Sequence, residues 1–153
     1  MTLMEVMEHL AALLREAVRD YAAEQPSGLR PIQVYAGYPP VPENAAEKSS
    51  FIYVLATDFT DEEGEDYSTA KVEIGFSVYD EDEGNGWRSL YNLMEHARQA
   101  MLRRRCLAGR TVLVLPIKGA VPDNQPFPQW EGKITASYQI GQPVEEGINY
   151  DNF

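Results

Sequence analysis

The sequence predicts a single α+β domain in which a mainly antiparallel sheet of about five strands carries two helices on one face. Three observations support this fold class. Two segments place apolar residues at the spacing of an amphipathic helix, and five others have the composition of strands. These segments follow the order α-β-β-β-α-β-β. Short loops between several successive strands favour antiparallel pairing, and one-sided alternation favours helices on a single face.

The first helix is predicted over residues 2–25, with one apolar face. The residues of that face recur at three- and four-residue steps: Leu3, Val6, Met7, Leu10, Leu13, Leu14, Ala17, Val18 and Tyr21. Thr2 and Glu5 have the spacing of a capping box, in which each side chain accepts a hydrogen bond from a backbone N–H at the start of the helix. Pro26 and Gly28 then end the helix.

Five strands are predicted, at residues 32–36, 51–57, 71–79, 111–117 and 133–140. The second and fourth are broadly apolar, whereas the third and fifth alternate with a period of two. The alternation predicts a buried face formed by Val72, Ile74, Phe76, Val78, Ile134, Ala136, Tyr138 and Ile140. It also predicts a polar second face of the sheet, formed by Lys71, Glu73, Ser77, Lys133, Thr135, Ser137 and Gln139. An acidic loop at residues 58–66 is expected between the second and third strands.

The second helix is predicted from residue 85 or 86 to residue 105, directly after the stretch YDEDEGNGW at residues 79–87. Its buried stripe is expected to contain Trp87, Leu90, Tyr91, Met94, Ala97 and Met101. Acidic residues 80–83 would face the positive end of the helix dipole, while the glycines and Asn85 turn the chain and cap the helix.

Two ligand-binding interpretations of the same stretch are weaker. The EF-hand pattern needs a glutamate at position 12, where this sequence has Tyr91 or Asn92, depending on the starting residue. The glycines resemble a nucleotide-binding turn, but the four acids before them would repel a pyrophosphate. The stretch is therefore interpreted as the joint between a strand and a helix.

The charge of the chain restricts its partners. Thirteen basic and 24 acidic residues give a net charge of −11, which disfavours binding to a nucleic-acid backbone. No apolar run approaches the roughly 20 residues that span a bilayer. Acidic residues interrupt the apolar residues at the N-terminus, unlike in a signal peptide. We expect no membrane partner, a reducing compartment, one domain over residues 1–143 and a C-terminal arm over residues 144–153.

No catalytic, cofactor-binding or metal-binding residue is predicted. His9 and His96 lack the HxxxH or HExxH spacing of metal ligands, and no GxSxG, P-loop or CxxC motif occurs. Cys106 is the single cysteine, which excludes an internal disulfide, and it is expected to be a small core residue. We therefore expect a protein that is not an enzyme. A carboxylate-dependent hydrolase stays as an alternative, because acids are numerous.

Two stretches together resemble a known family. They are VEIGFSVYDEDEGNGWRSLYNLMEHARQAML and TVLVLPIKGAVPDNQPFPQWEGKITASYQI, within residues 51–143. A strand ends in an acidic turn, a helix begins with Gly-Trp-Arg, and a later loop reads PFPQWEG at residues 126–132. In these features the chain resembles the small tail-terminator, or tail-completion, proteins of bacteriophages and prophages.

The resemblance implies a non-enzymatic virion assembly protein without cofactors. Such proteins form a ring, commonly a hexamer, on the head-proximal end of the tail tube, where they stop tube polymerisation and dock to the head connector. The implied partners are further copies of this chain, the tail tube protein and the connector or stopper protein, while DNA passes through without specific binding. The implied location is the neck of the virion, after assembly in the cytoplasm of the host bacterium.

Ring closure needs two different patches on each subunit, because a head-to-tail interface joins unlike surfaces. Opposite charges on different parts of one chain suit such an interface. The predicted interface residues are Asp58, Asp61, Glu62, Glu63, Glu65, Asp66, Arg98, Arg103, Arg104 and Arg105. Two other functions remain open at this point: a head-completion protein of the same neck region, and an acidic inhibitor that mimics DNA.

Overall fold

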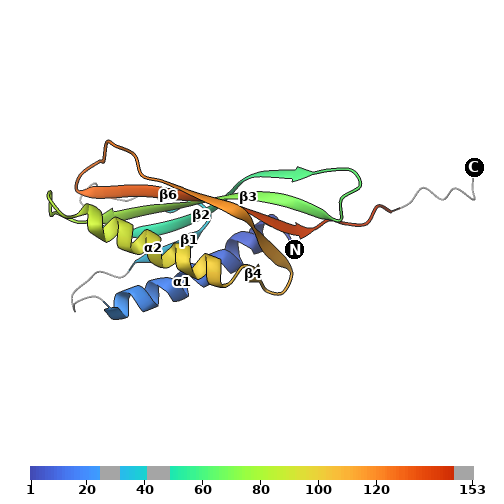
Figure 1. Cartoon of the computed structure of the whole chain (residues 1–153), viewed down its shortest axis with the longest axis horizontal. Coiled ribbons are helices and arrows are strands. Elements are labelled where there is room, and N and C mark those ends of the chain that lie inside the picture. Colours follow the sequence, from blue (N-terminus) through green and yellow to red (C-terminus); the bar gives the residue numbers. More distant parts are fainter. Residues whose placement is uncertain (25–31, 41–48, 147–153) are drawn as a thin grey trace, which may run out of the picture.

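The computed structural model describes residues 1–24, 32–40 and 49–146, which form two helices and one six-stranded sheet (Figure 1). The helices are α1 (Leu3–Glu24) and α2 (Trp87–Arg103). The strands are β1 (Gln33–Ala36), β2 (Phe51–Asp61), β3 (Tyr67–Tyr79), β4 (Cys106–Leu107), β5 (Thr111–Ala120) and β6 (Gln129–Gly141). The predicted α+β class is confirmed, with one strand more than expected.

The sheet has the order β1-β2-β3-β6-β5-β4, and all of its pairs are antiparallel except β1 with β2. The parallel pair makes the sheet mixed. The additional strand β4 has two residues, too few for any periodic signal in the sequence. Its Leu107 is buried opposite Thr111, so Cys106, one residue earlier, points to the other side and is exposed. The prediction of Cys106 as a core residue was therefore wrong.

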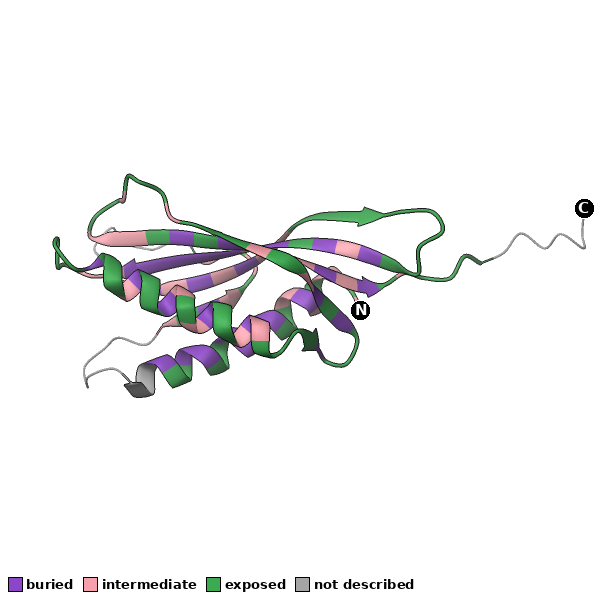
Figure 2. Ribbon diagram, viewed as in Figure 1, coloured by how far each residue is buried: buried purple, intermediate pink, exposed green. Residues whose placement is uncertain are grey.

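Both helices lie on one face of the sheet, and the core is the layer between the helices and the sheet (Figures 1 and 2). Helix α1 packs against β1 and β2, while α2 packs against β3 and β6. The pairing register places the apolar residues of β2, β3 and β6 on the same face of the sheet. Ile52 pairs with Phe76 and Ile74 pairs with Ile134, and all four are buried. Every residue predicted for the buried faces of β3 and β6 is buried.

Helix α1 matches its prediction closely. The Thr2 hydroxyl accepts a hydrogen bond from the Glu5 backbone N–H at 3.1 Å, which is one half of the expected capping box. Seven of the nine predicted face residues are buried, and Leu3 and Met7 are partly buried against the core. No helix of the described residues is long and apolar enough to cross a membrane.

The acidic loop predicted at residues 58–66 is mostly hairpin. Strand β2 continues to Asp61 and β3 begins at Tyr67, with a bulge between Ala56 and Asp58. Seven residues of β2 extend past the last residue that pairs with β1, a length of roughly 23 Å at strand rise. Residues 57–61 of β2 are exposed because this part of the hairpin passes beyond the helices, although Ser68 and Ala70 opposite them on β3 are buried (Figure 2).

Helix α2 buries part of the predicted stripe, namely Leu90, Ala97 and Met101, but replaces its aromatic residues by Leu93. Its buried residues are Leu90, Leu93, Ala97 and Met101, whereas Trp87 and Tyr91 are 42% and 50% exposed. The two rings instead pack edge to face, with centroids 5.6 Å apart. The Trp87 indole N–H donates to the Gly84 carbonyl at 3.1 Å, which holds this ring beside the turn before the helix.

Tyr138 of β6 is fully buried, and its hydroxyl has no hydrogen-bond partner among the described residues. A buried hydroxyl without a partner loses its hydrogen bonds to water and gains none in return. Burial also raises the pKa of this hydroxyl well above its ordinary value of 10.0.

Tyr138→Phe is expected to raise the free energy of unfolding by about 1 kcal/mol at pH 7, because it removes an uncompensated polar group without changing the shape of the ring. The gain should widen above about pH 10. There the unfolded tyrosine ionises while the folded one stays protonated, which lowers the stability of the parent chain alone. Urea unfolding of the parent and the variant at pH 7 and above about pH 10 measures this difference in stability. Equal or lower stability of the variant under both conditions would contradict the prediction.

Candidate interaction surfaces

The turn before α2 uses its acids to bind its own backbone. The Asp82 carboxylate accepts hydrogen bonds from the N–H groups of Gly84 and Asn85, both at 3.1 Å. Asp80 accepts from the Asp82 N–H at 2.9 Å and from the Ser89 hydroxyl, in the first turn of α2, at 2.7 Å. These bonds confirm a strand-to-helix joint. The expected side-chain cap is absent among the described residues, since Gly86 occupies the cap position.

The two motifs that carried the family resemblance contact each other. The Trp130 indole N–H donates to the Asp80 carbonyl at 2.9 Å, and the Asp80 N–H donates to the Pro128 carbonyl at 3.0 Å. Phe127 packs edge to face on Trp130, with ring centroids 6.0 Å apart. Gly86 permits this approach, because a Cβ there would lie 2.6 Å from both the Asp82 carbonyl oxygen and the Trp130 indole nitrogen. The acidic turn and the PFPQW loop therefore form one structural unit.

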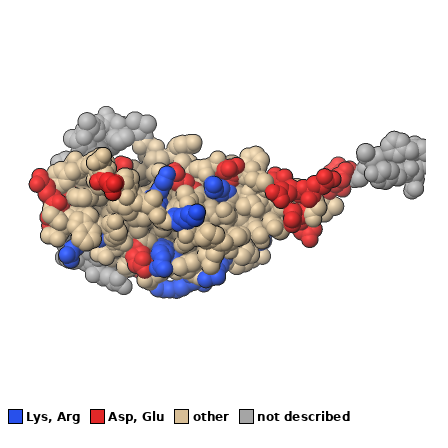
Figure 3. Space-filling view, turned by 45° about the horizontal axis from the view of Figure 1, so that its top comes forward, with Lys and Arg blue, Asp and Glu red and all other residues tan. Residues whose placement is uncertain are grey.

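The six predicted interface acids lie together on residues 58–66, which we call the acidic tip. Figure 3 shows these red side chains at one end of the molecule. Within the described part of the chain, no Lys or Arg forms an ion pair with any of them. Asp61 is bonded to the Ser68 hydroxyl, and Gln142 donates from its backbone N–H to the Asp66 carbonyl at 3.2 Å.

The segment after β6 adds to the acidic tip. Gln142 ties it to the hairpin, and the exposed Glu145 and Glu146 follow. Residues 144–146 have no regular structure, and the remainder of the predicted arm, residues 147–153, lies outside the described residues. The acidic tip also carries one large apolar side chain, Phe59, which is 61% exposed.

Basic residues gather on a different part of the chain, residues 87–120, which we call the basic side. It comprises α2, β4 and β5, and it holds seven of the 13 basic residues but one of the 24 acids. Its charged residues are Arg88, Glu95, Arg98, Arg103, Arg104, Arg105, Arg110 and Lys118. A chain of net charge −11 thus contains a segment of net charge +6, a contrast that the total conceals.

The four predicted interface arginines are all exposed at the C-terminal half of α2 and just after it. Two form exposed ion pairs within the subunit: Arg98 with Glu95 at 2.9 Å and Arg104 with Glu16 of α1 at 3.1 Å. Arg103 donates to the Gln99 side chain at 2.7 Å. The structure therefore brings the acids together and the arginines together, and it keeps the two groups on separate parts of the subunit.

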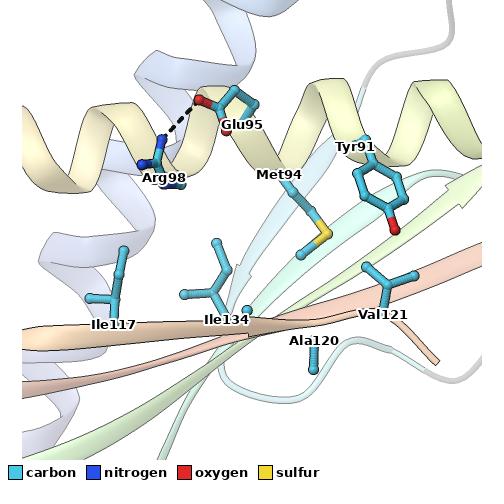
Figure 4. Close-up of a pocket in the computed structure, with 9 residues that line it drawn as sticks. Tyr91, Met94, Glu95, Arg98, Ile117, Ala120, Val121 and Ile134 are labelled. Carbon is cyan, nitrogen blue, oxygen red and sulfur yellow. Dashed lines mark hydrogen bonds and ion pairs between the residues drawn. The ribbon is translucent and has the colours of Figure 1, made fainter.

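An apolar groove that the sequence did not reveal crosses the basic side between α2 and the strands β5 and β6. It has a volume of about 380 Å³ (Figure 4). Met94 and Tyr91 of α2 point toward the strands, and Ile117 and Ile134 approach from the other wall. The Glu95–Arg98 ion pair lies along its helical edge. Tyr91 and Met94 had been predicted to be buried, and they line this open groove instead.

The face of the sheet opposite the helices is polar in its centre, as predicted. Glu73 of β3 forms an ion pair with Lys133 of β6 at 3.7 Å. The Tyr53 ring lies across Gly75, and its hydroxyl donates to Glu73 at 3.3 Å. Burial, followed by the negative charge of Glu73, raises the pKa of Tyr53. Within the described residues, no three His, Cys, Asp or Glu side chains converge as they would around a metal ion.

Comparisons with known proteins find only weak similarity in sequence and structure. No protein-family model matches the chain, and no curated protein matches it. One solved structure, whose description names no function, is 15% identical with a TM-score of 0.46, covering 90% of this chain and 97% of that one. Another, described as the virion of a native gene transfer agent particle, is 14% identical with a TM-score of 0.40, covering 86% of this chain and 96% of that one. Likeness at these TM-scores does not assign a function.

Gly86→Ala is expected to destabilise the protein by about 2 kcal/mol or more, because the new methyl group would overlap backbone and indole atoms that cannot both move away. Gly84→Ala is the matched control, since its Cβ would approach nothing closer than 3.7 Å. Thermal unfolding of the two variants measures the difference. Equal melting temperatures would show that the acidic turn and the PFPQW loop are not packed as described.

Proposed function

We propose that this chain is a structural, non-enzymatic subunit of a phage-type particle, and specifically a tail terminator. In this role it forms a ring, of six subunits as the resemblance implies, on the head-proximal end of the tail tube, where it ends tube growth and joins the tail to the head connector. The observation that carries the proposal is the separation of charge into an acidic tip and a basic side on one subunit. The two motifs of the resemblance support it, because they form a single packed unit.

Charge separation favours assembly over catalysis. A subunit with opposite charges at different places is complementary to its own copy in a head-to-tail arrangement, and such an arrangement closes into a ring when the rotation permits. The acidic tip carries no basic partner among the described residues, so its charges remain available to another chain. In the ring, the chain contacts its own copies, the tube protein and the connector, while DNA passes through an acidic environment that repels it.

A head-completion protein on the other side of the neck is the nearest alternative, because the same surfaces suit it. The acidic tip also fits a DNA-mimic inhibitor, since six acids over nine residues imitate a run of phosphates. The basic side distinguishes the two classes: a DNA mimic has no use for seven basic residues, whereas a ring subunit uses both charges.

Purified particles test the location. When heads and tails are separated, immunoblotting should find the protein with tails, and tails assembled without it should be of irregular length. Recovery with heads would favour the head-completion function. Absence from all particles, together with a persistent monomer in solution, would contradict both.

Arg103→Glu combined with Arg105→Glu is expected to weaken assembly at low salt, because it replaces attraction to the acidic tip by repulsion. These two arginines are chosen because Arg104 is paired with Glu16 in the same subunit. Added salt should weaken assembly of the parent chain toward the level of the variant, since exposed charges are screened. Light scattering measures the oligomer, and Arg19→Glu on the exposed side of α1 is the control. An unchanged oligomer would contradict the pairing of the two surfaces.

A further inference from the structure

We infer that the apolar groove between α2 and β5/β6 receives the Phe59 side chain of a neighbouring copy of this chain. The inference rests on the proposed ring, and it adds the contact that holds one subunit to the next. In this contact, the acidic tip of one copy lies along the basic side of the next, with Phe59 as its apolar anchor.

The groove and Phe59 are matched in chemistry and size. The groove is walled by apolar side chains from both the helix and the strands, and its volume of about 380 Å³ exceeds the roughly 150 Å³ that suffices for a benzene ring. Phe59 is the large apolar side chain of an otherwise acidic hairpin end, and it is 61% exposed. Aromatic anchors that enter a pocket on the partner commonly dominate the energy of an interface.

The charges beside the two features are complementary. Phe59 pairs with the buried Ala70 across the hairpin, so it projects on the helix side of the sheet. Asp61, two residues later, projects on the same side. Arg98 lines the helical edge of the groove together with Glu95, its ion-pair partner, and Arg103 lies five residues farther along the helix, on a different side of it. A phenylalanine with an acid on the same side of its hairpin therefore meets an apolar groove whose edge carries Arg98, which exchanges its pairing with Glu95 for a contact with the acidic tip.

Geometry excludes insertion of Phe59 into the groove of its own subunit. Phe59 is fixed opposite Ala70, whereas the groove residue Ile134 is opposite Ile74. These positions differ by four residues along β3, or about 13 Å, and by two strand spacings, or about 10 Å, across the sheet. Ladder hydrogen bonds hold both strands in place. The Phe59 side chain can therefore enter this groove only from another copy of the chain.

Site-directed cross-linking tests the contact. Cys106, which is exposed, is first replaced by serine so that it forms no disulfide. One batch of protein then carries Phe59→Cys and a second carries Tyr91→Cys at the rim of the groove. A disulfide-linked dimer is expected when the two batches are mixed under mild oxidation, and little in either batch alone. Tyr67→Cys replaces Phe59→Cys in the control, because Tyr67 lies on the other face of the same hairpin.

Truncation gives an independent measure. Phe59→Ala should weaken assembly about tenfold or more, whereas Tyr67→Ala should change it less than about twofold. Because Phe59 is mostly exposed in the subunit, the melting temperature of the monomer should stay unchanged. This contact would be overturned if Phe59→Ala still formed rings and the Phe59→Cys and Tyr91→Cys batches gave no cross-link. That outcome would leave the proposed function standing. A parent chain that never assembles, in solution or in particles, would overturn the proposed function and this contact together.

Discussion

The ladder between β3 and β6 is the constraint on which the rest of the structure depends. It joins all thirteen residues of each strand, from Tyr67 opposite Gly141 to Tyr79 opposite Gln129. These strands are separated in sequence by α2, β4 and β5, so their pairing closes a long loop that contains all three elements. Helix α2 rests on both strands, β2 pairs with the free side of β3, and β5 pairs with the free side of β6.

Much of the fold follows from local patterns. The period of two in β3 and β6 identified their buried faces, because register in a sheet with one buried side allows no slip of one residue. The three- and four-residue spacing in α1 identified its buried face, because residues at those steps lie on one side of a helix. Helix α2 was harder, since Trp87 and Tyr91 are apolar enough to belong to a core but lie against the turn and each other. The parallel partner of β2 and the two-residue β4 depend on pairing between distant segments, which no local pattern encodes.

The candidate site was predictable in its charges and not in its shape. The sequence identified the acids of residues 58–66 and the arginines at the end of α2, because runs of like charge are visible without a fold. It expected a loop where β2 and β3 continue as a hairpin, since polar residues usually indicate a loop. The groove beside Met94 was not predictable, because its walls come from three elements whose relative placement is set by the core.

The outer edge of β5 affects how readily this sheet can be extended by a strand of another molecule. On this edge, β4 pairs with Thr111 and Val112, the Leu113 N–H donates to the Arg105 carbonyl, and Pro116 farther along offers no N–H. The ladder on the inner edge, with β6, is also irregular between Val114 and Lys118, which bends the strand. A strand edge broken in this way is a poor template for another strand. This edge of the sheet therefore gives little support to pairing of β5 with a strand of another molecule.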